Sequence, residues 1–141
     1  MLGRVAYALH LVPVSLLILT GRAVGHWPWT LGLQIAGILL ILWARLTFGR
    51  RSFHAGSTPT AGGLETRGPY RWVRHPIYAG VLLMLAGALA AHRDLYALVA
   101  VTVAVATIGV RIWSEEREVS RRYPDYADYA RRTRRLVPWL L

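Results

Sequence analysis

Two neighbouring carboxylates, Glu115 and Glu116, follow an apolar stretch in the second half of the sequence. Adjacent acids at the end of a helix repel each other and oppose the helix dipole. Near a bilayer such groups are costly and usually have a cationic partner. Arg111 lies four residues before Glu115, on the same helix face. The pair predicts a salt-bridge cluster, Glu115 with Arg111 and Glu116 with Arg74 or Arg71, or a site for a cationic ligand.

A second unusual run, GPYRWVRHPIYAG, occupies residues 68–80. Pro76 suits the first turn of a helix, and it disfavours helical geometry at His75. The helix is then expected to open with free amide groups beside Arg74 and His75, an arrangement that suits a carboxylate or phosphate. Gly80, one turn further on, lets a ligand or a helix approach closely.

The two runs are expected to lie side by side, because helices at 76–91 and 94–122 would form a hairpin. An anion-binding helix start, a carboxylate pair and aromatic rings then share one face of the protein. Such a site fits a ligand that carries both a carboxylate and a cation. S-adenosylmethionine is such a molecule, with an amino-acid end, a sulfonium and an adenine.

The elements that position these runs are long apolar stretches. Four stretches are nearly free of charge, and each approaches the roughly 20 residues that cross a ~30 Å hydrocarbon core. A chain of 141 residues has too little interior to bury four helices that are apolar all round, which argues against a soluble bundle. We predict one all-α domain, residues 1–141, an integral membrane bundle of four transmembrane helices with a cytoplasmic C-terminal helical tail. The expected helices span about 3–20, 30–48, 76–91 and 94–122, with a tail helix at 125–135.

The charges predict the orientation of this bundle. All 17 basic side chains are arginine, and the net charge is +10. If the helices cross in turn, one side carries Arg22 and Arg93, and the other carries Arg4 and the arginines of 45–74 and 111–135. The positive-inside rule then places both termini and the site in the cytoplasm, and anionic lipids account for the charge without nucleic acid. The all-arginine basic set is compatible with a GC-rich bacterial genome, and we expect a multi-pass protein of a bacterial inner membrane. The first stretch lacks a good cleavage site and is read as a retained helix. Trp27 and Trp29 fit an aromatic belt at the outer interface.

The motif residues resemble the isoprenylcysteine carboxyl methyltransferase and phospholipid methyltransferase families. The resemblance runs from about residue 62 to the C-terminus. It rests on the run at 68–80 and on the residues at matching distances after it: Arg111, Glu115, Glu116, Tyr123, Tyr126, Tyr129, an arginine cluster and Pro138.

The resemblance implies an all-helical membrane methyltransferase that uses S-adenosylmethionine and is not Rossmann-like. Arg111 would face the acceptor, where it could orient a carboxylate or phosphate, and Glu116 would be the second catalytic candidate. The acceptor would be a lipophilic molecule, an isoprenylcysteine-type carboxylate or a lipid headgroup. By matching position, the cofactor pocket would be lined by Gly62, Gly63, Leu64, Glu65, Tyr70, His75, Pro76, Ile77, Tyr78 and Glu115.

Two other readings of the same residues stay open at this point. Membrane sterol-type reductases resemble this family in their C-terminal helices but bind a nicotinamide cofactor, and the basic loop would suit NADPH phosphates. A membrane protein without activity could keep the same fold and would bind neither cofactor. The chain has no cysteine, so disulfides, thiol catalysis and cysteine metal sites are excluded, and no metal is expected.

Overall fold

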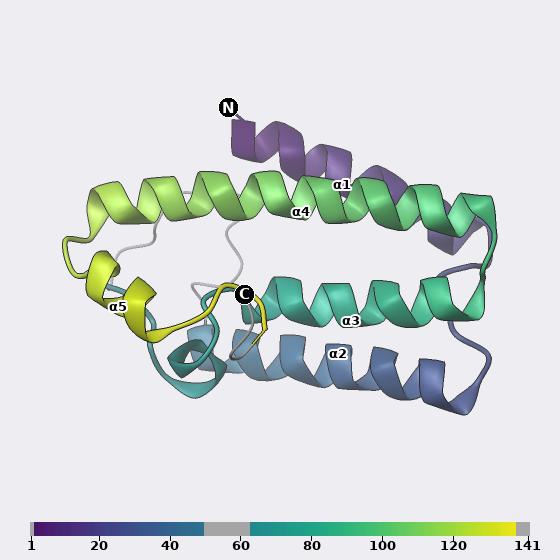
Figure 1. Ribbon diagram of the computed structural model, residues 1–141, viewed down its shortest axis with the longest axis horizontal. Helices are drawn as coiled ribbons and strands as arrows, with labels where there is room; N and C mark the ends of the chain where they lie inside the picture. The colour runs from purple at the N-terminus through teal and green to yellow at the C-terminus, as the bar shows by residue number, and fades with distance from the viewer. Residues whose placement is uncertain (1, 50–62, 138–141) are drawn as a thin grey trace.

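The computed structural model describes residues 2–49 and 63–137, with side chains from residue 11 onward; Gly62 and Pro138 lie outside this part of the chain. The described residues contain helices and no strand, which confirms the all-α class. The elements in chain order (Figure 1) are α1 (Leu2–Leu19), α2 (Pro28–Phe48), the 3-10 helix η2 (Gly68–Arg71), α3 (Pro76–Ala91), α4 (Leu95–Arg122) and α5 (Tyr126–Arg132).

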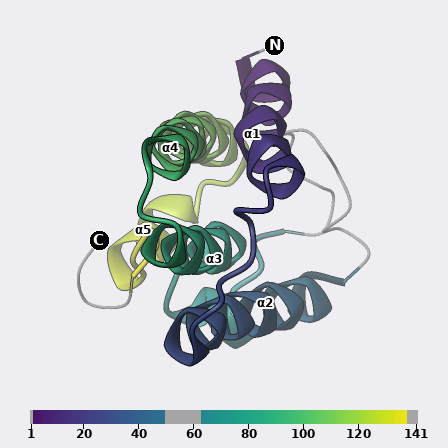
Figure 2. The ribbon, with the colours of Figure 1, turned by 90° about the vertical axis from the view of Figure 1, so that its right-hand side faces the viewer.

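The four long helices form two pairs, which Figure 2 shows end-on. Helix α2 packs along α3, and α1 packs along α4, whereas α3 and α4 approach each other less closely. Alanines recur every three to four residues on α4 and so lie on one buried face. The buried apolar cluster between the helices consists of Leu17, Leu85, Ala97, Ala100, Val101, Ala104, Ile108 and Ile112.

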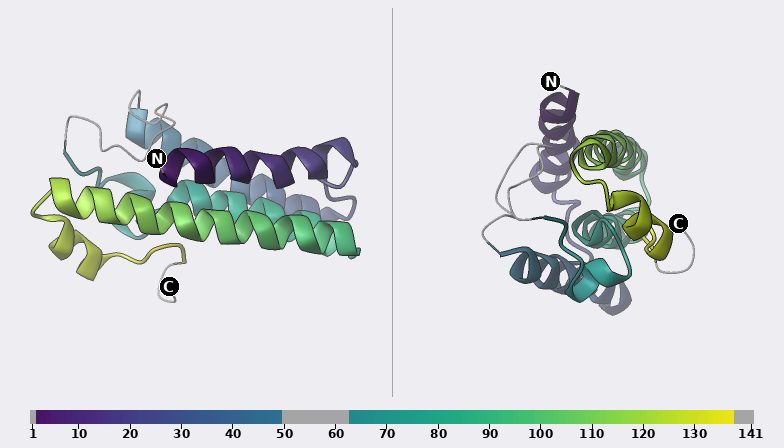
Figure 3. Two further views of the ribbon diagram at one scale, coloured as in Figure 1. Left: turned by 90° about the horizontal axis from the view of Figure 1, so that it is seen from above. Right: turned by 90° about the vertical axis from the view of Figure 1, so that its left-hand side faces the viewer.

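The bundle has two ends of different character (Figure 1 and Figure 3). The connections α1–α2 and α3–α4 lie at one end. The start of α1, the end of α2, the start of α3 and helix α5 lie at the other. The start of α3 and the last turns of α4 therefore share an end, as the hairpin predicts.

The close packing of α2 on α3 depends on glycine. A Cβ atom on Gly37 would lie 2.5 Å from the backbone oxygen of Gly80, and one on Gly80 would lie 2.6 Å from the oxygen of Gly37. These distances are shorter than any real Cβ contact, so the two backbones touch where neither residue has a side chain. The sequence predicts close approach of a ligand or a helix at Gly80, and the structure shows a helix.

Polar side chains join the connections at the end of the bundle away from the start of α3. The side chain of Gln34 on α2 is buried, accepts from the Gly25 amide at 2.9 Å and donates to Ala23 O at 2.7 Å. Arg22 Nε lies 2.7 Å from Asp94 Oδ2, which links the two turns. The Ala97 amide donates to the same carboxylate, and this bond together with Arg22 holds the pKa of Asp94 below its ordinary value.

Two helices in the described part of the chain, α2 and α4, are long and apolar enough to cross a membrane. Helix α3 is apolar but has only 16 residues, which span about 24 Å at 1.5 Å per residue, against a hydrocarbon core of about 30 Å. Crossing by all four helices is therefore not confirmed, and for α1 and α3 it stays a prediction.

The tail helix is shorter than predicted. The sequence predicts a helix over 125–135, and α5 ends at Arg132. Beyond it Thr133 is extended and Arg134 forms an isolated parallel bridge with Val73, so the chain leaves the helix to pair with the segment before α3. The predicted start is close, with Asp125 at the N-cap position but without a side-chain capping bond.

The glycine contact predicts the effect of adding a single methyl group. Gly37→Ala forces α2 and α3 apart and should lower the free energy of unfolding by about 1–3 kcal/mol. Gly32→Ala is the matched control, because the same methyl group meets nothing within 4 Å on the same helix. This control should be neutral or more stable, by up to about 1 kcal/mol. Thermal unfolding in detergent measures both, and equal midpoints for the two variants would contradict the proposed contact.

Candidate functional site

The start of α3 has the local geometry that its proline predicts. His75 is the N-cap residue, with non-helical φ −123° and ψ 59°, and Pro76 occupies the first helical position. The backbone oxygen of His75 accepts the first hydrogen bond of the helix, from the Ala79 amide at 3.0 Å. The proline thus places the His75 ring beside the helix start, where the ring is mostly buried and lies close to α4.

Glu115 is held by a closed triad of hydrogen bonds. Tyr78 Oη donates to Glu115 Oε1 at 2.5 Å, and Arg111 Nη2 donates to the same oxygen at 2.9 Å. Arg111 Nε donates to Tyr78 Oη at 2.7 Å. The Arg111 side chain is only 8% exposed, so the carboxylate and the hydroxyl solvate a guanidinium that is otherwise shielded from water.

Glu116 binds cations from two other segments. Arg74 Nε donates to Oε1 at 3.0 Å, and Arg135 Nε donates to Oε2 at 3.0 Å. His75 lies between the acids, with Nε2 3.4 Å from Glu116 Oε1 and Nδ1 3.8 Å from Glu115 Oε2. The acidic pair on α4 therefore joins the start of α3 to the residues after α5.

The segment after α5, residues 133–136, runs alongside the residues that precede α3. The Arg74 amide donates to Arg134 O at 2.7 Å and the His75 amide to Arg135 O at 3.0 Å. The Arg134 amide donates back to Trp72 O at 2.9 Å. These backbone bonds place the Arg135 side chain within reach of Glu116.

Helix α5 is fixed to the same region by side chains. Arg74 Nη1 donates to Ala130 O at 2.8 Å and to Thr133 O at 2.6 Å, which are carbonyl groups at the end of α5. Tyr129 Oη donates to Tyr70 O at 2.7 Å. Burial, followed by the negative charge of Glu116, raises the pKa of Tyr126 to about 12, so this tyrosine stays neutral beside the acid.

A third carboxylate, that of the buried Glu65, lies on the η2 side of the site. Glu65 is 7% exposed and accepts from Arg67 Nε at 2.9 Å and Nη2 at 3.0 Å. The neighbouring Tyr70 is also buried, and its burial together with the negative charges of Glu65 and Glu115 raises its pKa. The charge of Arg45 acts in the opposite direction.

The structure brings together the central residues that the sequence analysis selects. Tyr78, His75, Arg111, Glu115 and Glu116 form one connected cluster, with the predicted pairs Arg111–Glu115 and Arg74–Glu116. Arg71 does not join the cluster and instead lies over the Trp72 ring, 3.6 Å from its centroid.

The remaining predicted pocket residues make other contacts. Glu65 is paired with Arg67, and the backbone oxygen of Tyr70 accepts from Tyr129. Pro76 is buried, Leu64 and Ile77 are half-buried, and Gly63 is exposed. Gly62 lies outside the described residues.

Sequence reasoning missed Arg135 and the bond from Tyr129 to Tyr70 O. The sequence carried one signal for the first of these, an acidic pair that needs several cations in a region rich in arginine. Nothing local distinguishes Arg135 from its neighbours, because its position depends on the extended pairing of residues 133–136 with the segment before α3.

Comparison with known proteins gives one family and two curated relatives. The phospholipid methyltransferase family model matches residues 6–126. The cobalt-zinc-cadmium resistance protein CzcN of Cupriavidus metallidurans is 32% identical over 136 residues, covering 92% of this chain and 59% of that protein. The nickel-cobalt-cadmium resistance protein NccN of Alcaligenes xylosoxydans xylosoxydans is 39% identical over 79 residues, covering 55% of this chain and 37% of that protein. The chain thus spans little more than half of CzcN. No solved structure matches it.

The ionic contacts of Glu116 predict how firmly residues 133–136 are held. Glu116→Gln removes the charge that binds Arg135 and Arg74, so the amides of Arg74 and His75 should exchange with solvent about tenfold faster, a loss of about 1–2 kcal/mol. The control Asp128→Asn breaks an exposed pair with Arg131 and should have little effect. Hydrogen exchange followed by mass spectrometry measures both, and unchanged exchange in Glu116→Gln would show that the backbone bonds hold the segment without Glu116.

Proposed function

Because this chain belongs to the phospholipid methyltransferase family, we propose that it transfers a methyl group from S-adenosylmethionine to a lipophilic acceptor at the cytoplasmic face of a membrane. The observation that carries the proposal is the cluster of Tyr78, Arg111 and Glu115 beside the start of α3. The family model supports methyl transfer at a membrane, and the cluster is the group of largely buried, hydrogen-bonded side chains where donor and acceptor would meet.

The donor set of this cluster suits S-adenosylmethionine. Glu115 offers carboxylate oxygens to a cationic group, and the first turn of α3 offers the amide groups that follow Pro76 to a carboxylate. When bound, the cofactor supplies an electrophilic methyl group on its sulfonium. We propose that Tyr70, His75, Pro76, Ile77, Tyr78 and Glu115 bind it, together with residues 62–65.

Arg111 is proposed to orient the acceptor. It donates hydrogen bonds to both Tyr78 and Glu115, so a carboxylate or phosphate that reached it would be placed next to the cofactor site.

Glu116 is proposed to act mainly by holding other residues in position. Its two oxygens already accept from Arg74 and Arg135, and that arrangement keeps residues 133–136 beside the start of α3.

The charges favour an acceptor that is already anionic. An amine must lose a proton before it can accept a methyl group, which requires a base. Glu115 Oε1 accepts from Tyr78 and Arg111, and the two oxygens of Glu116 accept from Arg74 and Arg135, so donors already engage three of the four oxygens that could take a proton. An ionised carboxylate needs no base. We therefore favour an isoprenylcysteine-type carboxylate over the amine of a lipid headgroup.

The proposed membrane topology has four crossings, with both termini and the site in the cytoplasm. It rests on the fifteen arginines on one side of the expected helices against Arg22 and Arg93 on the other. The structure supports it, because the start of α1 and helix α5 lie at the same end of the bundle as the start of α3. In this topology the bilayer surrounds the four helices and also supplies the lipophilic acceptor.

The names of the two curated relatives concern metal resistance, and the site gives that activity no separate support. In the part of the chain that the structure describes, no group of three or more His, Cys, Asp or Glu side chains gathers to hold a metal ion. We keep metal resistance as a description of those proteins.

Cofactor binding tests the proposal directly. Titration of S-adenosylhomocysteine into the detergent-purified protein should give saturable heat, and Glu115→Gln and Tyr78→Phe should weaken binding about tenfold or more. Tyr96→Phe is the matched control, since Tyr96 is 73% exposed at the other end of α4. Binding of NADPH without S-adenosylhomocysteine would support a reductase, and binding of neither by folded protein would support a non-catalytic role.

The acceptor class has its own test. With S-adenosylmethionine present, a farnesylated cysteine derivative with a free carboxylate should form a base-labile methyl ester. Arg111→Gln should lower kcat/KM for it about 100-fold, as expected for loss of a charge-assisted pair. Arg117→Gln, an exposed arginine near Trp113 on the same helix, should leave the rate unchanged. Preferential methylation of phosphatidylethanolamine would overturn the anionic-acceptor argument while leaving methyl transfer intact.

A further inference from the structure

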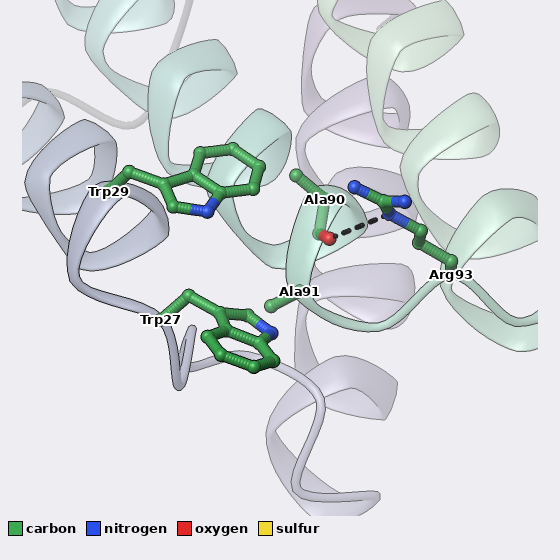
Figure 4. Close-up of a pocket in the computed structure, with 5 residues that line it drawn as sticks. All are labelled: Trp27, Trp29, Ala90, Ala91 and Arg93. Atoms are coloured by element: carbon green, nitrogen blue, oxygen red, sulfur yellow. Dashed lines mark hydrogen bonds between the residues drawn. The ribbon is translucent and has the colours of Figure 1, made fainter.

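A shallow pocket lies at the end of the bundle away from the start of α3 (Figure 4). It has a volume of about 450 Å³ and is lined by Trp27, Trp29, Ala90, Ala91 and Arg93. The two indoles come from the start of α2, and the two alanines from the last turn of α3. The small alanine side chains leave the space beside the indoles unfilled.

The polar side-chain groups of this pocket are hydrogen-bond donors, and the Ala90 carbonyl oxygen beside them accepts from Arg93. Trp27 and Trp29 are about half exposed, and within the described residues neither indole N–H has an acceptor. Arg93 donates from Nε to Ala90 O at 3.2 Å, which holds the guanidinium beside the pocket and leaves its two terminal nitrogens available to a ligand. A guanidinium and two N–H groups without an acidic neighbour in the lining favour an anion.

The nearest acid along the chain is already engaged. Asp94 follows Arg93, but its Oδ2 pairs with Arg22 at 2.7 Å and its Oδ1 caps α4 through the Ala97 amide at 2.9 Å. Asp94 therefore does not neutralise Arg93, and the positive charge of Arg93 is available to a ligand in the pocket. The pocket suits a phosphate group, because its arginine is positively charged and because it offers the several hydrogen-bond donors that phosphate oxygens require.

The apolar surroundings indicate which phosphate would bind. Leu31 and Ile35 lie one and two turns after Trp27 on the same face of α2, and both are exposed. The pocket thus continues into the apolar surface of a helix long enough to cross a membrane. A free phosphate gains nothing from that surface, whereas the acyl chains of a lipid would cover it.

We propose that this pocket binds the phosphate of a membrane phospholipid, with Arg93 as the charged donor, Trp27 and Trp29 as flanking donors, and the acyl chains along Leu31 and Ile35. The inference does not depend on methyl transfer. In the proposed topology the lipid belongs to the leaflet opposite the candidate site, so it is distinct from any acceptor or cofactor.

Native mass spectrometry of the detergent-solubilised full chain tests the proposal, with phosphatidylglycerol as the probe. Wild type should retain bound phosphatidylglycerol, and Arg93→Gln and Trp29→Leu should each weaken retention about tenfold, the loss expected for one charge-assisted bond or its flanking donor. Arg93→Lys should recover part of the affinity, because it keeps the charge without the planar fork. The matched control is Arg117→Gln, which removes an exposed arginine beside Trp113 at the other end of α4.

Three outcomes would overturn the proposal. Equal loss in Arg93→Gln and Arg117→Gln would indicate general electrostatic attraction. Equal retention of diacylglycerol with the same acyl chains would indicate apolar adhesion without a phosphate site. Displacement of the lipid by millimolar inorganic phosphate would indicate a site for soluble anions. Circular dichroism of each variant verifies the fold, and Trp27→Leu offers a second variant should Trp29→Leu fail to fold.

Discussion

Glu115 and Glu116 lie next to each other on α4, at the end of a helix whose earlier turns are apolar, and the structure at that end is arranged around their charges. A carboxylate removed from water needs hydrogen-bond donors, and a second one beside it doubles the need. Arg111, only 8% exposed, satisfies Glu115 together with Tyr78. Arg74 and Arg135 satisfy Glu116. The need of these two carboxylates for hydrogen-bond donors thus joins three segments that are far apart in the chain: the start of α3, the last turns of α4 and the residues after α5.

Helix packing complements this ionic end. The glycine contact holds α3 close to α2, and α1 packs along α4. The α2–α3 pair and the α1–α4 pair pack less closely against each other. Long side chains such as Tyr78 and Arg111 can therefore reach across between α3 and α4 near the site. At the opposite end, Gln34 and the Arg22–Asp94 pair tie the turns together. Apolar contacts and the glycine contact thus hold the helices together along their length, and polar side chains fix both ends of the bundle.

The parts that could be predicted from sequence are those set by local geometry. The pair Arg111–Glu115 follows from helical spacing, and the non-helical His75 from the proline after it. The pair Arg74–Glu116 follows from the hairpin of α3 and α4. The role of Arg135 and the early end of α5 did not follow, because both depend on the extended pairing of Arg134 with Val73, which no periodic pattern encodes. Crossing by α1 and α3 likewise does not follow from apolar composition, because a helix shorter than the hydrocarbon core crosses only where the bilayer thins or flanking side chains snorkel.

The shared position of Arg111 has a consequence for the proposed reaction. Its guanidinium donates to both Tyr78 and Glu115, so it is already part of the group proposed to bind the cofactor. An anionic acceptor that binds Arg111 would draw on the same positive charge, and Glu115 would then have more capacity for the cationic part of the cofactor. Binding of each ligand would therefore favour binding of the other, and by linkage the coupling free energy is the same in both directions. In the proposed reaction a single buried arginine would align the acceptor and would also leave Glu115 available to the cofactor, and an isolated ion pair would offer less than the triad of Tyr78, Arg111 and Glu115.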